Sequence, residues 1–135
     1  SCSPKPSSYD NTLAQISYPV VMKYAVNAKR LYENYCGNCH QNDGRGLGKL
    51  IPPLRDADYF KASVHRTVWI IRHGQQGSIV VNGIEYNQNM PGNPQLKPLD
   101  IAQITTYLYN IWGSSEGVIT APQIEQYLKE KPEGL

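Results

Sequence analysis

The sequence predicts an all-α domain of four to five helices, with long loops and one small β-hairpin. Apolar residues recur at helical spacing in several segments, and an Asn-Gly pair separates two short runs that contain Ile and Val. The segments between the predicted helices are rich in Gly and Pro, which favours loops. The chain has 135 residues, the length of one domain. Loops this long are unusual in so small a domain unless a large rigid group fills the core between them.

The N-terminal part of the chain predicts an arm followed by a helix. Residues 1–24 are expected to form a tether or surface arm, because residues 1–18 are rich in Ser, Pro and Asn and show little periodicity. Residues 25–135 then form the domain. Asn27 is a plausible N-cap of the first helix, and from Gln41 to Arg55 the frequent Gly and Pro predict a loop. The apolar stripe of that first helix is Ala28, Leu31, Tyr32 and Tyr35.

The middle of the chain predicts two helices and the hairpin. A short helix is expected near Asp58, and a clearer one after Ser63 that ends at Gly74. Asn82-Gly83 lies between two short strand-like runs and predicts the hairpin turn. The core-facing residues of the second helix are expected to be Val64, Val68 and Ile71.

The C-terminal part predicts the longest helix and a last, shorter one. Pro98 suits the first position of the longest helix, and Gly113 ends it. Thr120 and Gln123 form a possible capping box for a last helix at about residues 121–131. The predicted inward residues of these two helices are Ile101, Ile104, Leu108 and Ile111, followed by Ile124, Tyr127 and Leu128.

Composition and charge exclude several classes of protein. The chain carries 13 basic and 11 acidic residues, a formal charge of +2, with no Lys/Arg block, so a nucleic-acid partner is not expected. No apolar run approaches the roughly 18 residues that a membrane span requires. Three cysteines are too few for a disulfide scaffold, and two of them lie three residues apart.

The segment from Cys36 to His40 reads Cys-Gly-Asn-Cys-His, the C-x-x-C-H pattern of covalent haem attachment. Thiols at i and i+3 of a helical turn reach the two vinyl groups on one edge of a porphyrin, and the next side chain directs an imidazole at the iron. A thioredoxin-like redox pair would need a βαβ context that the sequence lacks. A zinc site would need a fourth ligand near Cys36, Cys39 and His40, and the other histidines lie far along the chain.

With this motif the chain resembles the monohaem class I c-type cytochromes over roughly residues 25–127. The resemblance implies the class I cytochrome c fold around one haem c, attached through Cys36 and Cys39 with His40 as an iron ligand. It rests on the order of further short motifs, which are Asp43-Gly44-Arg45-Gly46, Pro52-Pro53-Leu54, Asp58-Tyr59, Gly74-x-x-Gly77, Val81-Asn82-Gly83 with Tyr86, Met90-Pro91, Thr106-Tyr107-Leu108 and Trp112-Gly113.

The sixth iron ligand is expected to be Met90. An electron-transfer haem needs both axial positions filled, and a thioether favours Fe(II). Met22 lies beside Val20 and Val21 and is expected to pack, whereas Met90 lies in a polar loop where a core role is hard to explain. The resemblance places its distal methionine at the same point. Bis-histidine ligation would require His65 or His73 to displace Met90.

The surroundings of the haem follow from chemistry and from the resemblance. The second ring nitrogen of His40 needs an acceptor in the Pro-rich loop, and the resemblance assigns the Pro52 carbonyl, with Leu54 on the haem face. Buried aromatic side chains with an O–H or N–H group need partners, so any of several is a candidate for a haem propionate. These candidates are Tyr59, Trp69, Tyr86 and Tyr107, with Arg55 or Arg72 as a possible ion pair.

Cys2 is the odd cysteine. Ser1-Cys2 and the polar stretch after it resemble the end of a bacterial lipobox, in which the cysteine carries a lipid. The Ser before Cys2 departs from a cleaved lipoprotein, which begins at its cysteine. A lipid anchor at Cys2 and an extracytoplasmic, periplasmic location are therefore expected.

The predicted function is single-electron transfer by one haem c, without substrate turnover. The expected partners are redox proteins, such as a quinol-oxidising complex, a terminal oxidase or a dehydrogenase, that dock over the exposed haem edge with weak salt dependence. Two alternatives remain: a haem enzyme or gas sensor with an open distal site, and a fixed haem subunit of a larger respiratory complex.

Overall fold

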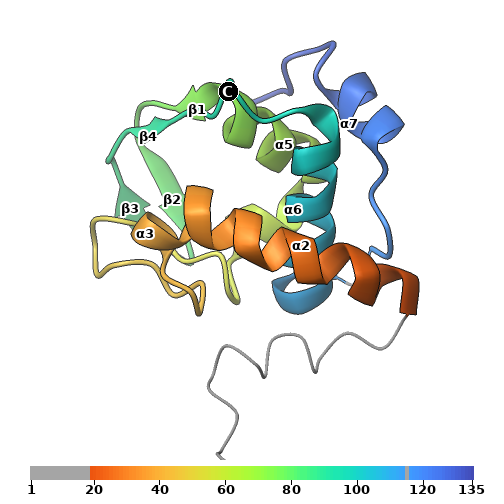
Figure 1. The fold of residues 1–135 in the computed structure, drawn as a ribbon. Helices are drawn as coiled ribbons and strands as arrows, with labels where there is room; N and C mark the ends of the chain where they lie inside the picture. The colour runs from red at the N-terminus through yellow and green to blue at the C-terminus, as the bar shows by residue number, and fades with distance from the viewer. Residues whose placement is uncertain (1–18, 115) are drawn as a thin grey trace, which may run out of the picture.

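The computed structural model describes residues 19–114 and 116–135, and this part of the chain forms six helices and two small antiparallel sheets (Figure 1). The helices are α2 (Pro19–Tyr35), α3 (Gly37–His40), α4 (Asp58–Ala62), α5 (Val64–His73), α6 (Pro98–Trp112) and α7 (Ala121–Tyr127). The strands are β1 (Gly74–Gln75), β2 (Ile79–Val81), β3 (Ile84–Tyr86) and β4 (Met90–Pro91). None of the described helices is long and apolar enough to cross a lipid bilayer.

Helix α6 is the centre of the core. It packs along α2 on one side, and α5 and α7 pack against it elsewhere, as Figure 1 shows. Ala25 and Ala28 of α2 are fully buried, and such small side chains let two helices approach closely. The predicted inward residues Ile101, Ile104 and Leu108 of α6 are buried as well. Helices α2, α5 and α7 therefore form the helical core around α6.

The predicted helix ends are confirmed where the signal is local. The Ser63 side chain accepts a hydrogen bond from the Arg66 N–H at the start of α5, and Gly74 ends that helix with a φ of 78°. Pro98 opens α6. Both halves of the predicted capping box at the start of α7 are formed, between Thr120 and Gln123.

The predicted hairpin is confirmed as β2–β3. Its register pairs Val81 with Ile84, and both turn residues, Asn82 and Gly83, have positive φ. A second ladder was not predicted: β1 pairs with β4, so that Gly74 lies opposite Pro91 and Gln75 opposite Met90.

The first helix differs from the prediction. It begins at Pro19, so residues 19–24 of the expected arm are helical, and the apolar stripe extends back through Met22 and Ala25 at spacings of three. Asn27 is not a cap, because its side-chain amide donates to Gln103 Oε1 of α6 at 2.5 Å. Tyr35 was expected to face inward and is 39% exposed. The last helix ends at Tyr127, earlier than the predicted residue 131. Residues 1–18 of the arm, with Cys2, lie outside the described residues.

Candidate functional site

The cysteine motif forms a tight turn directly after α2. Three backbone hydrogen bonds shape it: Cys36 N to Tyr32 O at 2.7 Å, Cys39 N to Cys36 O at 3.2 Å and His40 N to Cys36 O at 2.9 Å. Cys36 is buried, Cys39 is exposed, and both are free thiols. A side chain at Gly37 would place its Cβ 2.6 Å from the Asn42 side-chain oxygen, so Asn42 would have to move to admit it.

The two thiols do not have the properties of the alternative sites. Burial, reinforced by the neighbouring Cys39, raises the pKa of the Cys36 thiol to about 12, whereas a redox-active thiol needs a lowered pKa. Among the described residues, no group of three or more His, Cys, Asp or Glu side chains is arranged to hold a metal ion. The geometry therefore supports neither a thioredoxin-like pair nor a zinc site.

His40 is buried and fixed by the loop that follows it. Its Nδ1 lies 3.0 Å from the Pro52 carbonyl oxygen, so the ring N–H donates there and Nε2 is left with a free lone pair. Burial lowers the pKa of the imidazole, and the bond to Pro52 opposes this only in part. His40 is thus held as a neutral ring in one orientation, which is the form that binds a metal ion.

The loop from Gln41 to Arg55 is tied back on itself, which sets the position of Pro52. Gly46 N donates to His40 O at 2.9 Å, and Leu54 N donates to Gly44 O at 2.8 Å. Gly46 has a φ of 72°, and a Cβ there would lie 2.2 Å from Ile51 O. Only glycine fits that conformation and that close approach.

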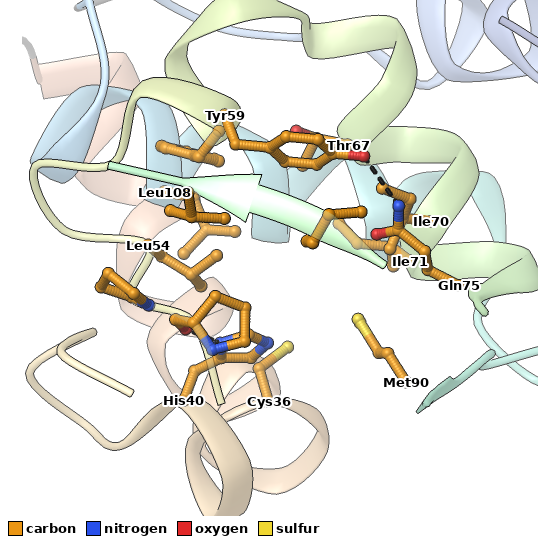
Figure 2. Close-up of a pocket in the computed structure, with 15 residues that line it drawn as sticks. Cys36, His40, Leu54, Tyr59, Thr67, Ile70, Ile71, Gln75, Met90 and Leu108 are labelled. Atoms are coloured by element: carbon orange, nitrogen blue, oxygen red, sulfur yellow. Dashed lines mark hydrogen bonds between the residues drawn. The ribbon is translucent and has the colours of Figure 1, made fainter. Parts of the chain in front are cut away.

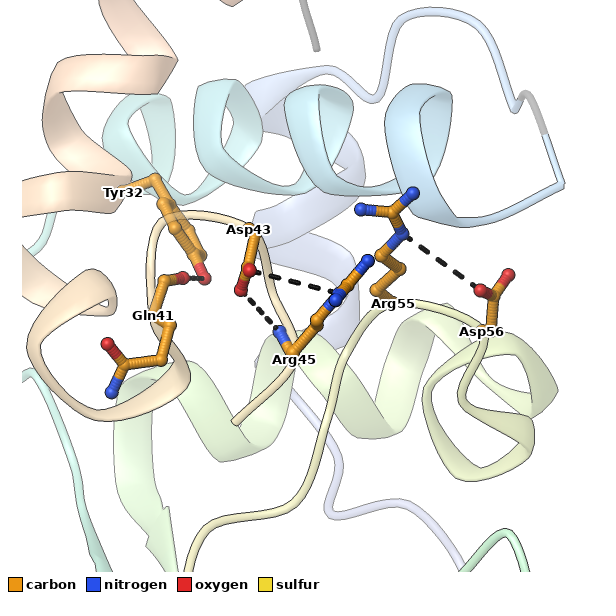
Figure 3. A network of polar contacts seen from close by, with 6 residues as sticks. All are labelled: Tyr32, Gln41, Asp43, Arg45, Arg55 and Asp56. Atoms are coloured by element: carbon orange, nitrogen blue, oxygen red, sulfur yellow. Dashed lines mark hydrogen bonds and ion pairs between the residues drawn. The ribbon is translucent and has the colours of Figure 1, made fainter. Parts of the chain in front are cut away.

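A polar network fixes the first residues of this loop (Figure 3). The Tyr32 hydroxyl donates to Gln41 O at 2.5 Å, and burial raises the pKa of this phenol far above its ordinary value. Asp43 accepts from the Arg45 N–H at 3.1 Å and lies 3.8 Å from the Arg45 side chain. These contacts hold the start of the loop directly after His40.

Two adjoining hollows lie beside this turn. Cys36 borders the first hollow and Cys39 the second, while His40 and Met90 border both. In Figure 2, His40 and Cys36 lie together on one side and the Met90 sulfur points into the space from another. Most of the other lining residues are apolar: Pro53, Leu54, Phe60, Ile70, Ile71, Val81 and Leu108 in the first hollow, Leu50, Ile51 and Pro91 in the second, and Pro52 and Ile79 in both.

One polar group faces the first hollow without a complete set of partners. The Tyr59 hydroxyl accepts from Gln75 Nε2 at 2.7 Å (Figure 2), and its own hydrogen has no acceptor among the described residues. The Arg66 guanidinium lies 3.5 Å from the centre of the Tyr59 ring. An apolar cavity with two thiols, a neutral imidazole, a thioether and one donor for a carboxylate fits a haem with its propionates.

The other predicted contact residues are only partly brought together. Pro52, Leu54 and Tyr59 border the first hollow, and the buried Tyr86 borders the second. Trp69 borders neither: it packs on His73, with ring centres 4.3 Å apart, beside a separate polar hollow.

The remaining residues predicted to contact the haem or its iron make their contacts away from the two hollows. Arg55 borders neither hollow and lies 4.0 Å from the Asp56 carboxylate (Figure 3). Arg72 donates to Leu96 O at 2.6 Å. Tyr107 is buried in the helix core against Tyr32. The His65 Nε2 faces the carbonyls of Tyr127 and Glu130, so it has no path to the cavity.

Gln75 and the cavity face of α5 were missed from the sequence. Gln75 borders both hollows and pairs with Met90 across β1 and β4. Ile70 and Ile71 of α5 and Leu108 of α6 line the first hollow. A periodic apolar pattern predicts that such residues are buried, but it does not distinguish burial against another helix from burial against a cofactor. The only available signal for Gln75 was its position one residue after the helix-ending Gly74.

Comparison with known proteins identifies the family of this chain. A family model described as "Cytochrome c" matches residues 25–112, a range that includes the cysteine motif and Met90. Two proteins named cytochrome c-552, both from Thermus thermophilus, are 30% identical to the chain over 105 residues. Each alignment covers 71% of this chain, and 80% and 71% of the two relatives. The resemblance seen in the motifs and the expected class I cytochrome c fold are thereby confirmed.

Proposed function

The chain belongs to the cytochrome c family, whose cofactor is a covalently attached haem c that serves electron transfer, and we propose that it carries single electrons between respiratory redox proteins. In this proposal one haem occupies the two adjoining hollows, bound through Cys36 and Cys39. His40 and Met90 would hold its iron. The observation that carries the proposal is that His40 and Met90 border both adjoining hollows, with Cys36 on the first and Cys39 on the second.

The histidine side supports a permanent ligand. The Pro52 carbonyl fixes the ring orientation of His40 and keeps its proton on Nδ1, so Nε2 is the ligating atom. Because the ring is buried and neutral, protons compete with the metal less than at an exposed histidine.

The methionine side supports a second ligand that favours the reduced state. Met90 is half-buried in β4 and its sulfur points into the cavity (Figure 2). When bound, the haem supplies an iron that gains or loses one electron. His40 and Met90 would hold this iron from two sides, and a thioether ligand favours its reduced state.

Tyr59 supports a role in holding the haem by its carboxylates. Its hydroxyl is oriented by Gln75 and keeps one hydrogen available, which suits a propionate oxygen. The Arg66 guanidinium behind the ring adds positive charge near the same point. Tyr59 thus orients the cofactor, while the apolar lining excludes water.

The second hollow is the proposed exit for the electron. It opens beside the exposed Cys39, and exposed apolar side chains lie near it: Leu50 on its rim, with Leu47 three residues before. Lys49 and Glu85 lie nearby with opposite charges. We expect partners such as a quinol-oxidising complex, a terminal oxidase or a dehydrogenase to dock here through apolar contacts, in an extracytoplasmic compartment with Cys2 as a lipid anchor.

Absorption spectra of the purified holoprotein test this proposal against an open-site haem enzyme or gas sensor. We expect a c-type reduced spectrum, a weak near-red ferric band from the methionine–iron bond, and no change when carbon monoxide is added to the reduced protein. Rapid carbon monoxide binding would contradict His/Met ligation and favour the enzyme or sensor. Haem that acidified organic solvent extracts would contradict covalent attachment.

A further inference from the structure

The end of α5 and the segment that carries Met90 are joined by more than the short β1–β4 ladder. The backbone N–H of Asn93 lies 3.0 Å from Ile71 O and 3.1 Å from Arg72 O. The Asn93 side-chain amide donates to Ile71 O as well, at 2.9 Å. The Arg72 guanidinium donates to Leu96 O at 2.6 Å. These bonds begin three residues after Met90 and fasten its segment to the last turn of the helix.

Two glycines bring the backbones into contact at this junction. A Cβ at Gly92 would lie 2.6 Å from Arg72 O, and a Cβ at Gly74 would lie 2.4 Å from Met90 O. Real Cβ atoms do not approach backbone atoms so closely. The position of Met90 relative to α5 therefore depends on backbone contacts and hydrogen bonds, with no side chain between them.

The bonds from Asn93 satisfy a need of the helix. The last carbonyls of an α-helix have no partner inside it, and the C-terminal end carries partial negative charge that favours N–H donors. The Gly74 N–H donates to the Ile70 carbonyl, and Asn93 donates to the carbonyls of Ile71 and Arg72. The methionine segment is thus part of the C-terminal cap of α5. The same helix lines the cavity with Ile70 and Ile71.

We propose that Asn93 is a positioning residue that keeps Met90 on the iron by capping α5 with its side-chain amide. The inference rests on the proposed ligation by Met90. Asn93 borders neither hollow and acts only through the segment that it anchors. Loss of the amide bond weakens one of the contacts that anchor the segment, so an external ligand displaces the methionine more easily.

The test is a titration of the ferric holoprotein with imidazole, which competes with the Met90 sulfur for the iron. Asn93→Asp keeps the size of the side chain, removes the donor and places a carboxylate against Ile71 O at the negative end of α5. The matched control is Asn87→Asp, the same chemical change three residues before Met90. Asn87 is exposed, and its side chain makes no hydrogen bond to a described residue.

We expect imidazole to bind about tenfold more tightly to the Asn93→Asp variant than to the wild type, with a weaker near-red band. Asn93→Ala, which only removes the amide, should give roughly a threefold effect and serves if the Asp variant does not fold. Asn87→Asp should match the wild type. Unchanged imidazole affinity in Asn93→Asp and Asn93→Ala, with lowered unfolding stability alone, would overturn the proposal and leave Asn93 a purely structural cap.

The wild type and Met90→Ala separate this result from the parent proposal. A near-red band in the wild type that Met90→Ala abolishes establishes the ligation, and the Asn93 variants then decide the inference. If the wild type lacks the band, or Met90→Ala keeps it, the ligation by Met90 fails and the role of Asn93 falls with it.

Discussion

The two sides of the cavity are built in different ways. On the histidine side, the cysteines, His40 and its partner Pro52 come from one continuous segment. Backbone hydrogen bonds close this segment, and at Gly46 only glycine fits. On the methionine side, Met90 is held by contacts with the end of α5, a different element. Covalent attachment belongs to the first side alone. The comparison predicts that the proposed ligand His40 stays in place and that the proposed ligand Met90 is the one released first.

The largest effect is expected when the covalent link is removed. In Cys36→Ser/Cys39→Ser the haem loses both thioether bonds, so acidified organic solvent should extract all of it, or the protein should mature without haem. Intact-mass measurement of the purified chain decides this. Met90→Ala is the matched variant on the other side and should keep the full haem mass. Loss of covalent haem in Met90→Ala would mean that the two sides are not distinct.

Met90→Ala is expected to change the iron without releasing the cofactor. The near-red band should disappear, the reduced protein should bind carbon monoxide, and the reduction potential should fall by about 0.1 V or more, within the roughly 0.8 V range that axial ligands span. Spectroelectrochemical titration measures this. Met22→Ala is the control, because Met22 packs against the helix core and borders neither hollow. An unchanged potential in Met90→Ala would show that another group is the sixth ligand.

Gly46→Ala tests how rigid the histidine side is. The substitution combines positive φ with a Cβ 2.2 Å from Ile51 O, so we expect a loss of about 2–4 kcal/mol in the free energy of unfolding. Gly117→Ala has nearly the same φ, 71°, and nothing within 4 Å of its Cβ, so it should lose only about 1 kcal/mol. Urea unfolding of both variants gives the difference. Equal losses would show that the loop adapts to the added methyl group.

Tyr109→Phe tests the support behind α5. The buried Tyr109 hydroxyl donates to Phe60 O and lies 2.8 Å from Thr67 Oγ1, so its removal should cost about 1–2 kcal/mol of unfolding free energy at neutral pH.

The same substitution has a pH signature. Burial raises the pKa of Tyr109 to about 12, so the folded chain holds this proton more tightly than the unfolded chain. The stability from this group is complete below pH 10 and is lost as pH rises toward 12. The difference between wild type and Tyr109→Phe should therefore shrink over that range in urea unfolding series. A constant difference would show that the phenol is not protected from ionisation.

The smallest effect is expected from salt. The exposed Leu50 lies on the rim of the second hollow, with exposed Leu47 three residues before it and the opposite charges of Lys49 and Glu85 nearby, so there is little net charge to screen. Electron-transfer rates to a partner, followed by stopped-flow absorption, should change less than about twofold between low and physiological salt. A steep decrease would point to an ion-paired interface. Leu50→Ser should slow the transfer more than salt does.

The features predictable from the sequence are those that a few neighbouring residues decide. Ser63, Gly74, Pro98 and the Thr120–Gln123 pair mark helix ends through local hydrogen bonds and backbone angles, and Asn82-Gly83 marks a turn for the same reason. The cysteine motif is likewise local. The start of the first helix was predicted too late. Its first turns carry only a weak apolar stripe through Met22 and Ala25, and they directly follow a Ser-, Pro- and Asn-rich stretch, so the sequence pattern does not mark where the helix begins.

What the sequence did not predict depends on contacts between distant segments. Strands of two residues, such as β1 and β4, carry no periodicity, so the pairing of Gln75 with Met90 leaves no trace in the sequence. An aromatic residue such as Trp69 fits a cofactor contact and ordinary packing equally well, and only the fold places it beside His73. Ile71 was expected in the core, and Ile70 was given no role. Burial against a haem and burial against a helix need the same apolar side chains, so the sequence does not distinguish the two.

Guanidinium unfolding of the ferric holoprotein, followed in one sample at the near-red band and by helical circular dichroism, tests the difference between the two sides most directly. We predict that the band is lost at a clearly lower denaturant concentration than the helix signal, because the methionine segment leaves the iron while the attached histidine side and the helices persist. Coincident transitions would contradict the account and show that both ligands belong to a single cooperative unit.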